Sequence, residues 1–234
     1  GTGADRDIVN GVDLDGEGGM VWTKARSTNH LHIMIDTERG ADKLLYPNDK
    51  WAEAVGGGDY ITSFNDDGYS LATQFYVNGV GEDYVSWTFR KAPRFFDVVT
   101  FVTGADSNRE IPHNLGVAPG MVFLKSTDAA EMWLVYHKDT GNNEYLVLNE
   151  NYKSYAGPQY WDSTDTNFII NEPNIFTPGQ EYVAYLFAHD ESDESLIKCG
   201  EMITTADGIG DIELGWEPQW VLYKESDRAG PWRM

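Results

Sequence analysis

The stretch GVAPGMVFLKSTDAAEMW (116–133) recurs later in the chain as GWEPQWVLYKESDRAGPW (215–232), and GGMVWTKARSTNHLH (18–32) precedes both. The matched lysines are Lys24, Lys125 and Lys224, so the offsets are 101 and 99 residues. A period of about 100 residues is too long for a solenoid repeat, but it matches the size of a whole β-sandwich. The sequence therefore predicts tandem sandwich units.

Segments rich in β-branched and aromatic residues alternate with turn-forming segments along the whole chain. The clearest predicted strands are 84–90, 97–104, 121–125, 132–137, 144–149 and 181–190. Helical periodicity is weak, and DKWAEAV (49–55) is the best candidate for one or two helical turns. We therefore expect an all-β fold built from tandem β-sandwich domains of the jelly-roll or lectin-like type.

The repeat also suggests where the units begin and end. The closing strands YVSWTFR (84–90) and YVAYLFAHD (182–190) match at an offset of 98 residues. We expect a first repeat over 1–96, a second over 97–195, and the start of a third, truncated repeat over 196–234. Because the third copy stops partway into its Trp-bearing strand, we expect the natural polypeptide to extend beyond Met234, or a neighbouring subunit to supply the missing strands.

Composition narrows the class of protein. The 38 acidic and 17 basic residues give a net charge of −21, which repels phosphate backbones and argues against nucleic acid as a partner. The single Cys199 excludes an internal disulfide framework. No apolar run approaches the roughly 20 residues that a membrane span needs, so membrane insertion is not expected.

The recurring lysines and tryptophans allow two interpretations each. Lys24, Lys125 and Lys224 each end a predicted strand, so they could contact a ligand or pair with a turn carboxylate such as Asp128 or Asp227. Surface ion pairs of this kind are common and weak, and we favour the pairing. Trp133 and Trp232 are expected to fill sandwich cores, as large aromatic residues usually do.

Metal ligands are sparse in the sequence. His30 and His32 would share one face of a strand, but no third ligand follows at suitable spacing, so zinc is not favoured. Asp13, Asp15 and Glu17 resemble the start of a calcium loop that lacks its later bidentate glutamate. They are weak calcium candidates, and no other cofactor is expected.

A polar, Gly- and Pro-marked stretch, NENYKSYAGPQYWDSTD (149–165), carries four aromatic residues. They are Tyr152, Tyr155, Tyr160 and Trp161. Exposed aromatic rings flanked by Asn, Gln and Asp could stack on sugars and bind their hydroxyl groups. The alternative is that this loop packs on its own domain or on a neighbouring subunit.

Four phrases carry a resemblance to a known family. YVSWTFRKAPRFFDVVTFVTG (84–104), IPHNLGVAPGMVFLKSTD (111–128), YVAYLFAHD (182–190) and LGWEPQWVLYK (214–224) resemble a repeat in tail-fibre-like virion proteins of bacteriophages, especially those of aquatic bacteria. The resemblance covers nearly the whole chain and carries over no catalytic residue.

The resemblance implies a virion protein, located in a tail fibre or another external appendage, rather than an enzyme. Its expected role is that of a fibre or adhesin that contacts other virion proteins and a host surface glycan. The expected assembly is a homotrimer that loosens in low salt with a chelator. Two alternatives stay open: a polysaccharide-degrading tailspike, and a purely structural head-decoration or collar protein.

Overall fold

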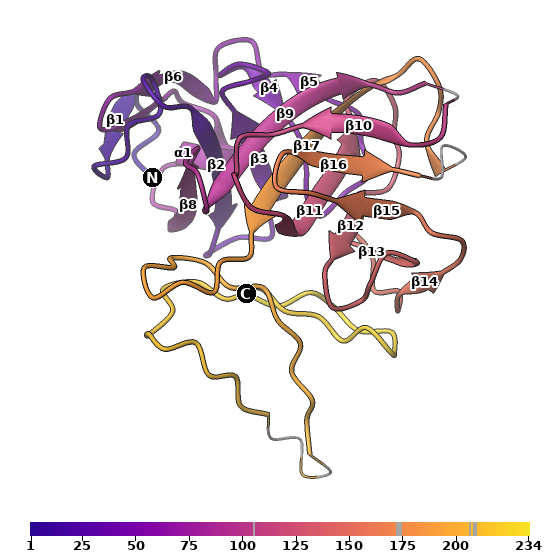
Figure 1. The fold of residues 1–234 in the computed structure, drawn as a ribbon. Coiled ribbons are helices and arrows are strands. Elements are labelled where there is room, and N and C mark those ends of the chain that lie inside the picture. The colour runs from indigo at the N-terminus through magenta and orange to yellow at the C-terminus, as the bar shows by residue number, and fades with distance from the viewer. Residues whose placement is uncertain (105, 172–174, 206, 208–209) are drawn as a thin grey trace.

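The computed structural model describes residues 1–104, 106–171, 175–205, 207 and 210–234. The expected all-β sandwich fold is confirmed, because the chain forms antiparallel sheets and, among the residues described, a single short helix, α1 (Phe75–Asn78) (Figure 1). The helical turns expected over 49–55 do not form. That segment is irregular up to its last two residues, which form the strand Ala54–Val55.

The strands fall into two sets, which we call the first unit (up to Arg90) and the second unit (Phe96–Ala188). The first unit contains β1 (Arg6–Val9), β2 (Gly19–Ala25), β3 (Ile33–Asp36), β4 (Lys43–Leu44), β5 (Ala54–Val55), β6 (Ile61–Asn65), β7 (Gly68–Leu71) and β8 (Tyr84–Arg90). The second unit contains β9 (Phe96–Val102), β10 (Arg109–Pro112), β11 (Pro119–Ser126), β12 (Leu134–His137), β13 (Glu144–Val147), β14 (Tyr155–Ala156), β15 (Trp161–Ser163), β16 (Asn167–Ile170) and β17 (Glu181–Ala188).

The two units have the same strand order. The small sheet β1-β7-β6 of the first unit corresponds to β10-β16-β15 of the second. The main sheet β3-β2-β8 corresponds to β12-β11-β17, and the hairpin β4–β5 corresponds to β13–β14. The two halves therefore share one strand order, as a duplication requires. The second unit adds β9, which pairs with the outer edge of β17.

The strand register repeats as well. Met20 lies opposite Phe89, and Met121 lies opposite Phe187. Lys24 lies opposite Val85, and its counterpart on β11 lies opposite Val183. The register of the central strand pair is therefore the same in both units over Met20–Ala25 and Met121–Ser126, and β11 departs from it at a bulge between Pro119 and Met121.

Each unit has a core of its own, and a third core lies between the units. Residues such as Val21 and Tyr69 fill the space between the two sheets of the first unit, and Val122 and Phe168 fill that of the second. The opposite faces of both main sheets line a central core. Strands β11 and β17 are consequently buried on both faces, which explains their nearly continuous apolar sequences.

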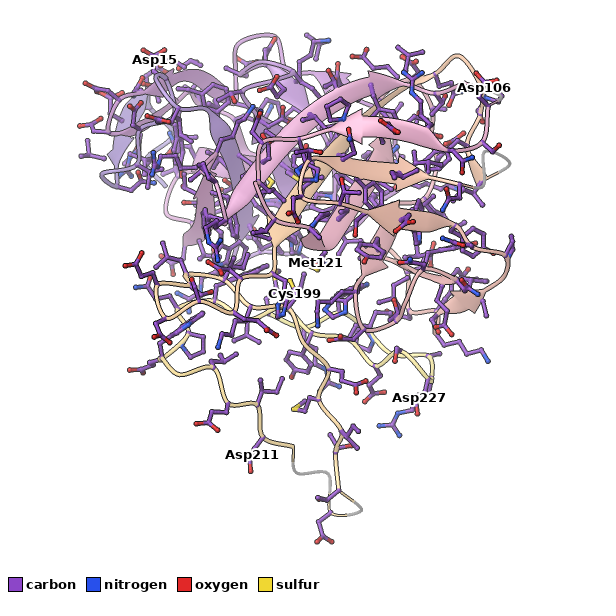
Figure 2. The ribbon with its side chains drawn as sticks, viewed as in Figure 1. Asp15, Asp106, Met121, Cys199, Asp211 and Asp227 are labelled. Atoms are coloured by element: carbon purple, nitrogen blue, oxygen red, sulfur yellow. The ribbon has the colours of Figure 1, made fainter. Side chains whose placement is uncertain are left out.

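The residues after the second unit, 196–234, form what we call the tail, which contains no strand among its described residues. In Figure 1 the tail, orange to yellow, runs along one side of the strand-bearing part. Figure 2 shows Met121 and Cys199 close together where the tail leaves β17, and both residues belong to the central core.

The tail begins the same hairpin as the second unit. Tyr223 and Arg233 form an antiparallel bridge with two backbone hydrogen bonds, each 3.0 Å. The counterparts of these residues, 99 positions earlier, are Leu124 and Leu134, which are paired in the β11–β12 ladder. Tail side chains such as Trp220 also pack against the central core.

The second unit joins the first through a buried tryptophan. The indole N–H of Trp133 donates to the carbonyl oxygens of Tyr46 (3.0 Å) and Asp49 (3.1 Å), just after β4. The Glu53 backbone N–H donates to the Thr127 carbonyl across the same contact at 2.9 Å. Trp133 is fully buried, as expected, but it lies between the units rather than inside its own sandwich.

The tail joins the second unit by the same contact. The indole N–H of Trp232 donates to the Val147 carbonyl at 2.8 Å, and the Ser154 backbone N–H donates to the Ser226 carbonyl at 2.9 Å. Val147 lies 101 positions after Tyr46, and Ser154 lies 101 positions after its own counterpart, Glu53. We call this repeated arrangement the unit joint.

Among the residues that the structure describes, the first joint alone contains a buried ionic network. The Tyr185 hydroxyl donates to Asp36 Oδ2 at 2.6 Å, and Arg39 lies 2.6 Å from the same carboxylate and 3.1 Å from that of Glu53. Burial opposes the charge on Arg39, but Tyr185, Asp36 and Glu53 together raise its pKa. Burial also raises the pKa of Tyr185 well above its usual value. The network fixes β17 of the second unit against the turn after β3 of the first.

Candidate functional site

The structure divides the four aromatic residues of the 149–165 stretch into two groups. Tyr152 and Tyr155 are exposed, with 44% and 39% of their surface accessible. Tyr160 and Trp161 are buried in the core of the second unit, at 8% and 0%. The exposed arrangement therefore holds for Tyr152 and Tyr155, and the alternative, packing on their own domain, holds for Tyr160 and Trp161.

The burial of Trp161 has a local cause. Residues 161–163 form β15, which pairs with β16, and this pairing turns the indole toward Phe168 in the core. The indole N–H donates to the Glu144 carbonyl at 2.9 Å. A strand of three residues inside a polar stretch leaves too short a pattern to be recognised in the sequence.

The two exposed tyrosines belong to a cluster on the β13–β14 hairpin. Tyr145 and Tyr155 are cross-strand partners, and their rings stack with centroids 5.1 Å apart and an interplanar angle of 17°. Tyr152 meets Tyr155 edge-on at 5.8 Å. Sequence reasoning missed Tyr145, although cross-strand pairing of the two segments could have identified it.

Solvent exposure decreases from one end of this group of tyrosines to the other. Tyr145 is partly buried and touches Tyr160 edge-on at 5.2 Å, so the inner end of the cluster meets the core. Burial, with Tyr160 and Tyr155 nearby, raises the pKa of Tyr145. The exposed rings of Tyr152 and Tyr155 are thus supported by Tyr145, which packs against the core. We call Tyr145, Tyr152 and Tyr155 the tyrosine cluster.

The carboxylates proposed for calcium do not converge. Asp13 accepts a hydrogen bond from the Gly16 N–H at 2.7 Å and closes a local turn. Asp15 lines one shallow depression, whereas Asp13 and Glu17 line another, where Glu17 lies 3.6 Å from Arg90. Within the described part of the chain, no group of three His, Cys, Asp or Glu residues could hold a metal ion.

The two histidines of the first unit also have separate partners. His30 lies 3.3 Å from Glu82. His32 Nδ1 accepts a hydrogen bond from the Trp22 indole at 3.0 Å. Burial, together with the nearby charge of Lys24, lowers the pKa of His32 to about 4. His32 is therefore neutral at pH 7, and the two imidazoles are engaged by different partners.

The recurring lysines bind backbone carbonyls rather than carboxylates. Lys125 Nζ donates to the Ser126 and Ala129 carbonyls at 2.7 and 2.9 Å, and Lys24 repeats the pattern with Ala25 and Thr28 at 2.5 and 3.1 Å. The expected pairing of Lys125 with Asp128 is wrong. That carboxylate instead accepts the Glu181 backbone N–H at 2.7 Å.

The lysine of the tail behaves in the same way. Lys224 Nζ donates to the Gly230 carbonyl rather than to Asp227. A fully buried ammonium needs such partners, and Lys125 has no solvent access. The lysines therefore hold the turn that follows each repeated strand.

The sequence matches one protein-family model. A family model described as "Domain of unknown function (DUF7483)" matches residues 1–234. The chain belongs to the DUF7483 family. Neither the curated proteins nor the solved structures gave a match.

The DUF7483 match covers both units and the tail together. In the described residues of this DUF7483 chain, no helix is long and apolar enough to cross a membrane. Two open depressions lie largely on the first unit; one is lined mainly by polar and acidic residues, and the other by a mixture of apolar and charged residues. Of the sequence-predicted positions, Tyr152 and Tyr155 alone combine exposure with a shared, supported arrangement. The tyrosine cluster is therefore the candidate site.

Proposed function

We propose that this chain is a structural and adhesive protein of a bacteriophage virion, in a tail fibre or a similar external appendage. In this role it presents the tyrosine cluster to a glycan on the host surface. The proposal assigns the chain no catalytic role.

The observation that carries the structural part of the proposal is the repeated unit joint. The same tryptophan contact fixes the second unit to the first and the tail to the second. Units that share an apolar core and repeat one joint form a stiff element. A fibre needs this property, because a flexible linker between units would let an appendage bend freely.

The adhesive part rests on the chemistry of the cluster. The C–H faces of sugar rings pack on exposed aromatic rings, and phenol groups hydrogen-bond to sugar hydroxyls. Tyr152 and Tyr155 lie at right angles, 5.8 Å apart. Two rings in this arrangement offer a sugar one surface below and one beside it.

A glycan array of bacterial surface polysaccharides tests the adhesive part. We expect the wild-type chain to bind a subset of glycans and the Tyr152→Ala/Tyr155→Ala double variant to lose at least tenfold in affinity. Trp51→Ala is the matched control, because Trp51 precedes Tyr152 by 101 positions and is 51% exposed on the corresponding hairpin without the tyrosine cluster. Equal binding by wild type and double variant would contradict the adhesive role.

Immunogold electron microscopy tests the structural part. Antibodies raised against the purified chain should label the appendages of phage particles that encode it. Labelling of the capsid surface alone would instead favour a head-decoration protein, and particles without label would contradict the virion assignment.

A further inference from the structure

The β13–β14 hairpin carries a pair of phenols that its counterpart in the first unit lacks. Tyr145 and Tyr155 are direct cross-strand partners. The corresponding partners on the β4–β5 hairpin, 101 positions earlier, are Leu44 and Ala54. Because both hairpins form, the repeated fold does not require the phenols, and their pairing is specific to the second hairpin.

The hairpin of the first unit has an ionic contact between its two sides instead. Lys43 on β4 lies 2.5 Å from the carboxylate of Glu53, which directly precedes β5. The positions 101 residues later hold Glu144 and Ser154, which cannot form an ion pair with each other. The stacked phenols therefore lie on the hairpin that lacks the ionic contact.

The geometry of the two rings suits oxidative coupling of phenols. The rings are within 17° of parallel, and their centroids are 5.1 Å apart. Tyr145 is held in place by contact with Tyr160, whereas Tyr155 is 39% exposed, so an oxidant reaches it and its ring can turn. Loss of one electron and one proton from a phenol places unpaired spin on the carbons ortho to the oxygen. Two such rings in contact can join through these carbons.

We propose that Tyr145 and Tyr155 form an oxidative cross-linking site, at which a dityrosine bond joins β13 to β14. A haem peroxidase with hydrogen peroxide removes one electron and one proton from each phenol. The two radicals join through their ortho carbons in a new carbon–carbon bond. Each ortho hydrogen then moves to the phenol oxygen as a proton, which restores both aromatic rings. The peroxide takes up the two electrons and the two phenol protons and becomes two water molecules.

The surroundings select this pair over the other tyrosines that are in contact. Tyr152 meets Tyr155 edge-on, with centroids 5.8 Å apart, so these two rings are not stacked. The other stacked tyrosine pair among the described residues is Tyr60 and Tyr76, whose centroids are 6.4 Å apart. Tyr60 is only 8% exposed, which limits the access of an oxidant. We therefore expect the bond to form within one chain and at one pair.

Peptide mapping of the full chain after treatment with hydrogen peroxide and a haem peroxidase tests this proposal. Trypsin cuts after Lys153, between the two tyrosines, so the bond links peptides 139–153 and 154–198 into one species. Its mass is two hydrogen atoms below the sum of the two peptides. We expect Tyr145→Phe and Tyr155→Phe each to lower the yield of this species at least tenfold. The matched control, Tyr152→Phe, should retain it.

Each substitution removes one hydroxyl group and keeps the ring, and circular dichroism establishes that the variants retain their β structure. Wild type treated in urea provides a second measurement that needs no variant, because the unfolded chain no longer stacks the two rings and should lose the linked species. An equal yield in urea would overturn the proposal. So would cross-links that join only separate chains on a denaturing gel, or a linked species that persists in Tyr155→Phe.

Discussion

The two unit joints share one hydrogen-bonding pattern but differ in how completely they are closed. At the first joint Trp133 is fully buried, stacks 6.1 Å from Tyr185 and lies beside the buried Arg39–Asp36 pair. At the second joint Trp232 is partly exposed, and the ion pair nearby among the described residues, Arg228–Glu225, is exposed. The hydrogen bond specifies where a unit docks, whereas the packing and the ionic network determine how firmly it is held.

Replacement of the two joint tryptophans should separate these contributions most clearly. We expect Trp133→Ala to lower the free energy of unfolding by about 4 kcal/mol, because it leaves a large cavity between the units. The effect of Trp232→Ala should be about 1 kcal/mol, since its ring is already partly in water. Urea unfolding followed by tryptophan fluorescence measures both, and equal losses would mean that the joints are equally closed.

Removal of the arginine in the first joint should come next. Arg39→Met leaves the carboxylate of Asp36, which is fully buried, without its cation, and we expect a loss of about 3 kcal/mol. The control is Arg228→Met in the tail, which breaks an exposed pair with Glu225 and should cost less than about 1 kcal/mol. The same urea titration reads both variants. If Arg39→Met lowers the free energy of unfolding by less than Arg228→Met does, packing alone stabilises the joint.

The buried lysine should make stability depend on pH. Burial, opposed by Glu131 and reinforced by Arg39, lowers the pKa of Lys125 to about 8, from 10.5 in an unexceptional environment. Between pH 8 and pH 10 the unfolded chain therefore holds more protons than the folded chain, and the free energy of unfolding rises with pH. We expect a gain of about 2 kcal/mol over this window from Lys125.

The measurement is the difference between the pH profiles of wild type and Lys125→Met. A difference is needed because burial raises the pKa of the Cys199 thiol to about 12, and this residue lowers stability as the pH rises above 9. Both chains share that effect. The partly exposed Lys24 provides the comparison, and Lys24→Met should change the profile less. Parallel profiles for wild type and Lys125→Met would contradict the buried charge.

The smallest effect on stability is expected at the two corresponding hairpins. Tyr152→Ala and Trp51→Ala each remove an exposed ring and should change the free energy of unfolding by no more than about 0.5 kcal/mol. Thermal unfolding checks this. A large loss at Tyr152 alone would show that the tyrosine cluster holds the fold together, and the glycan proposal would then lose its main support.

The repeat made most of the architecture predictable. The 99- and 101-residue offsets indicated the duplication, and the alternation of strands and turns indicated the all-β class. The sequence did not predict which side chains fill the joint: Trp133 was expected in the core of its own sandwich, but it lies in the core between the units. A tryptophan on a strand with two apolar faces can enter either core, and local sequence does not distinguish the core within a unit from the core between units.

The sequence also did not predict the hydrogen-bond partners of the lysines, or which aromatic residues of the 149–165 stretch are buried. The sequence around Lys125 reads as a charged strand end, yet backbone carbonyls surround this ammonium group, and only the folded turn brings them there. Tyr155 and Trp161 lie in the same polar stretch, but pairing of β15 with β16 buries the second and leaves the first exposed. The unit boundaries and the trimer remain predictions.

The double-sided burial of β11 and β17 has a consequence for the timescales of motion. Almost every residue of these strands is shielded on both faces, and each strand is hydrogen-bonded on both edges. Their amide hydrogens can meet solvent only when both units and the central core open together. In deuterium exchange these amides should be the last to exchange, at the rate of global unfolding, while β14 and the tail exchange through local fraying.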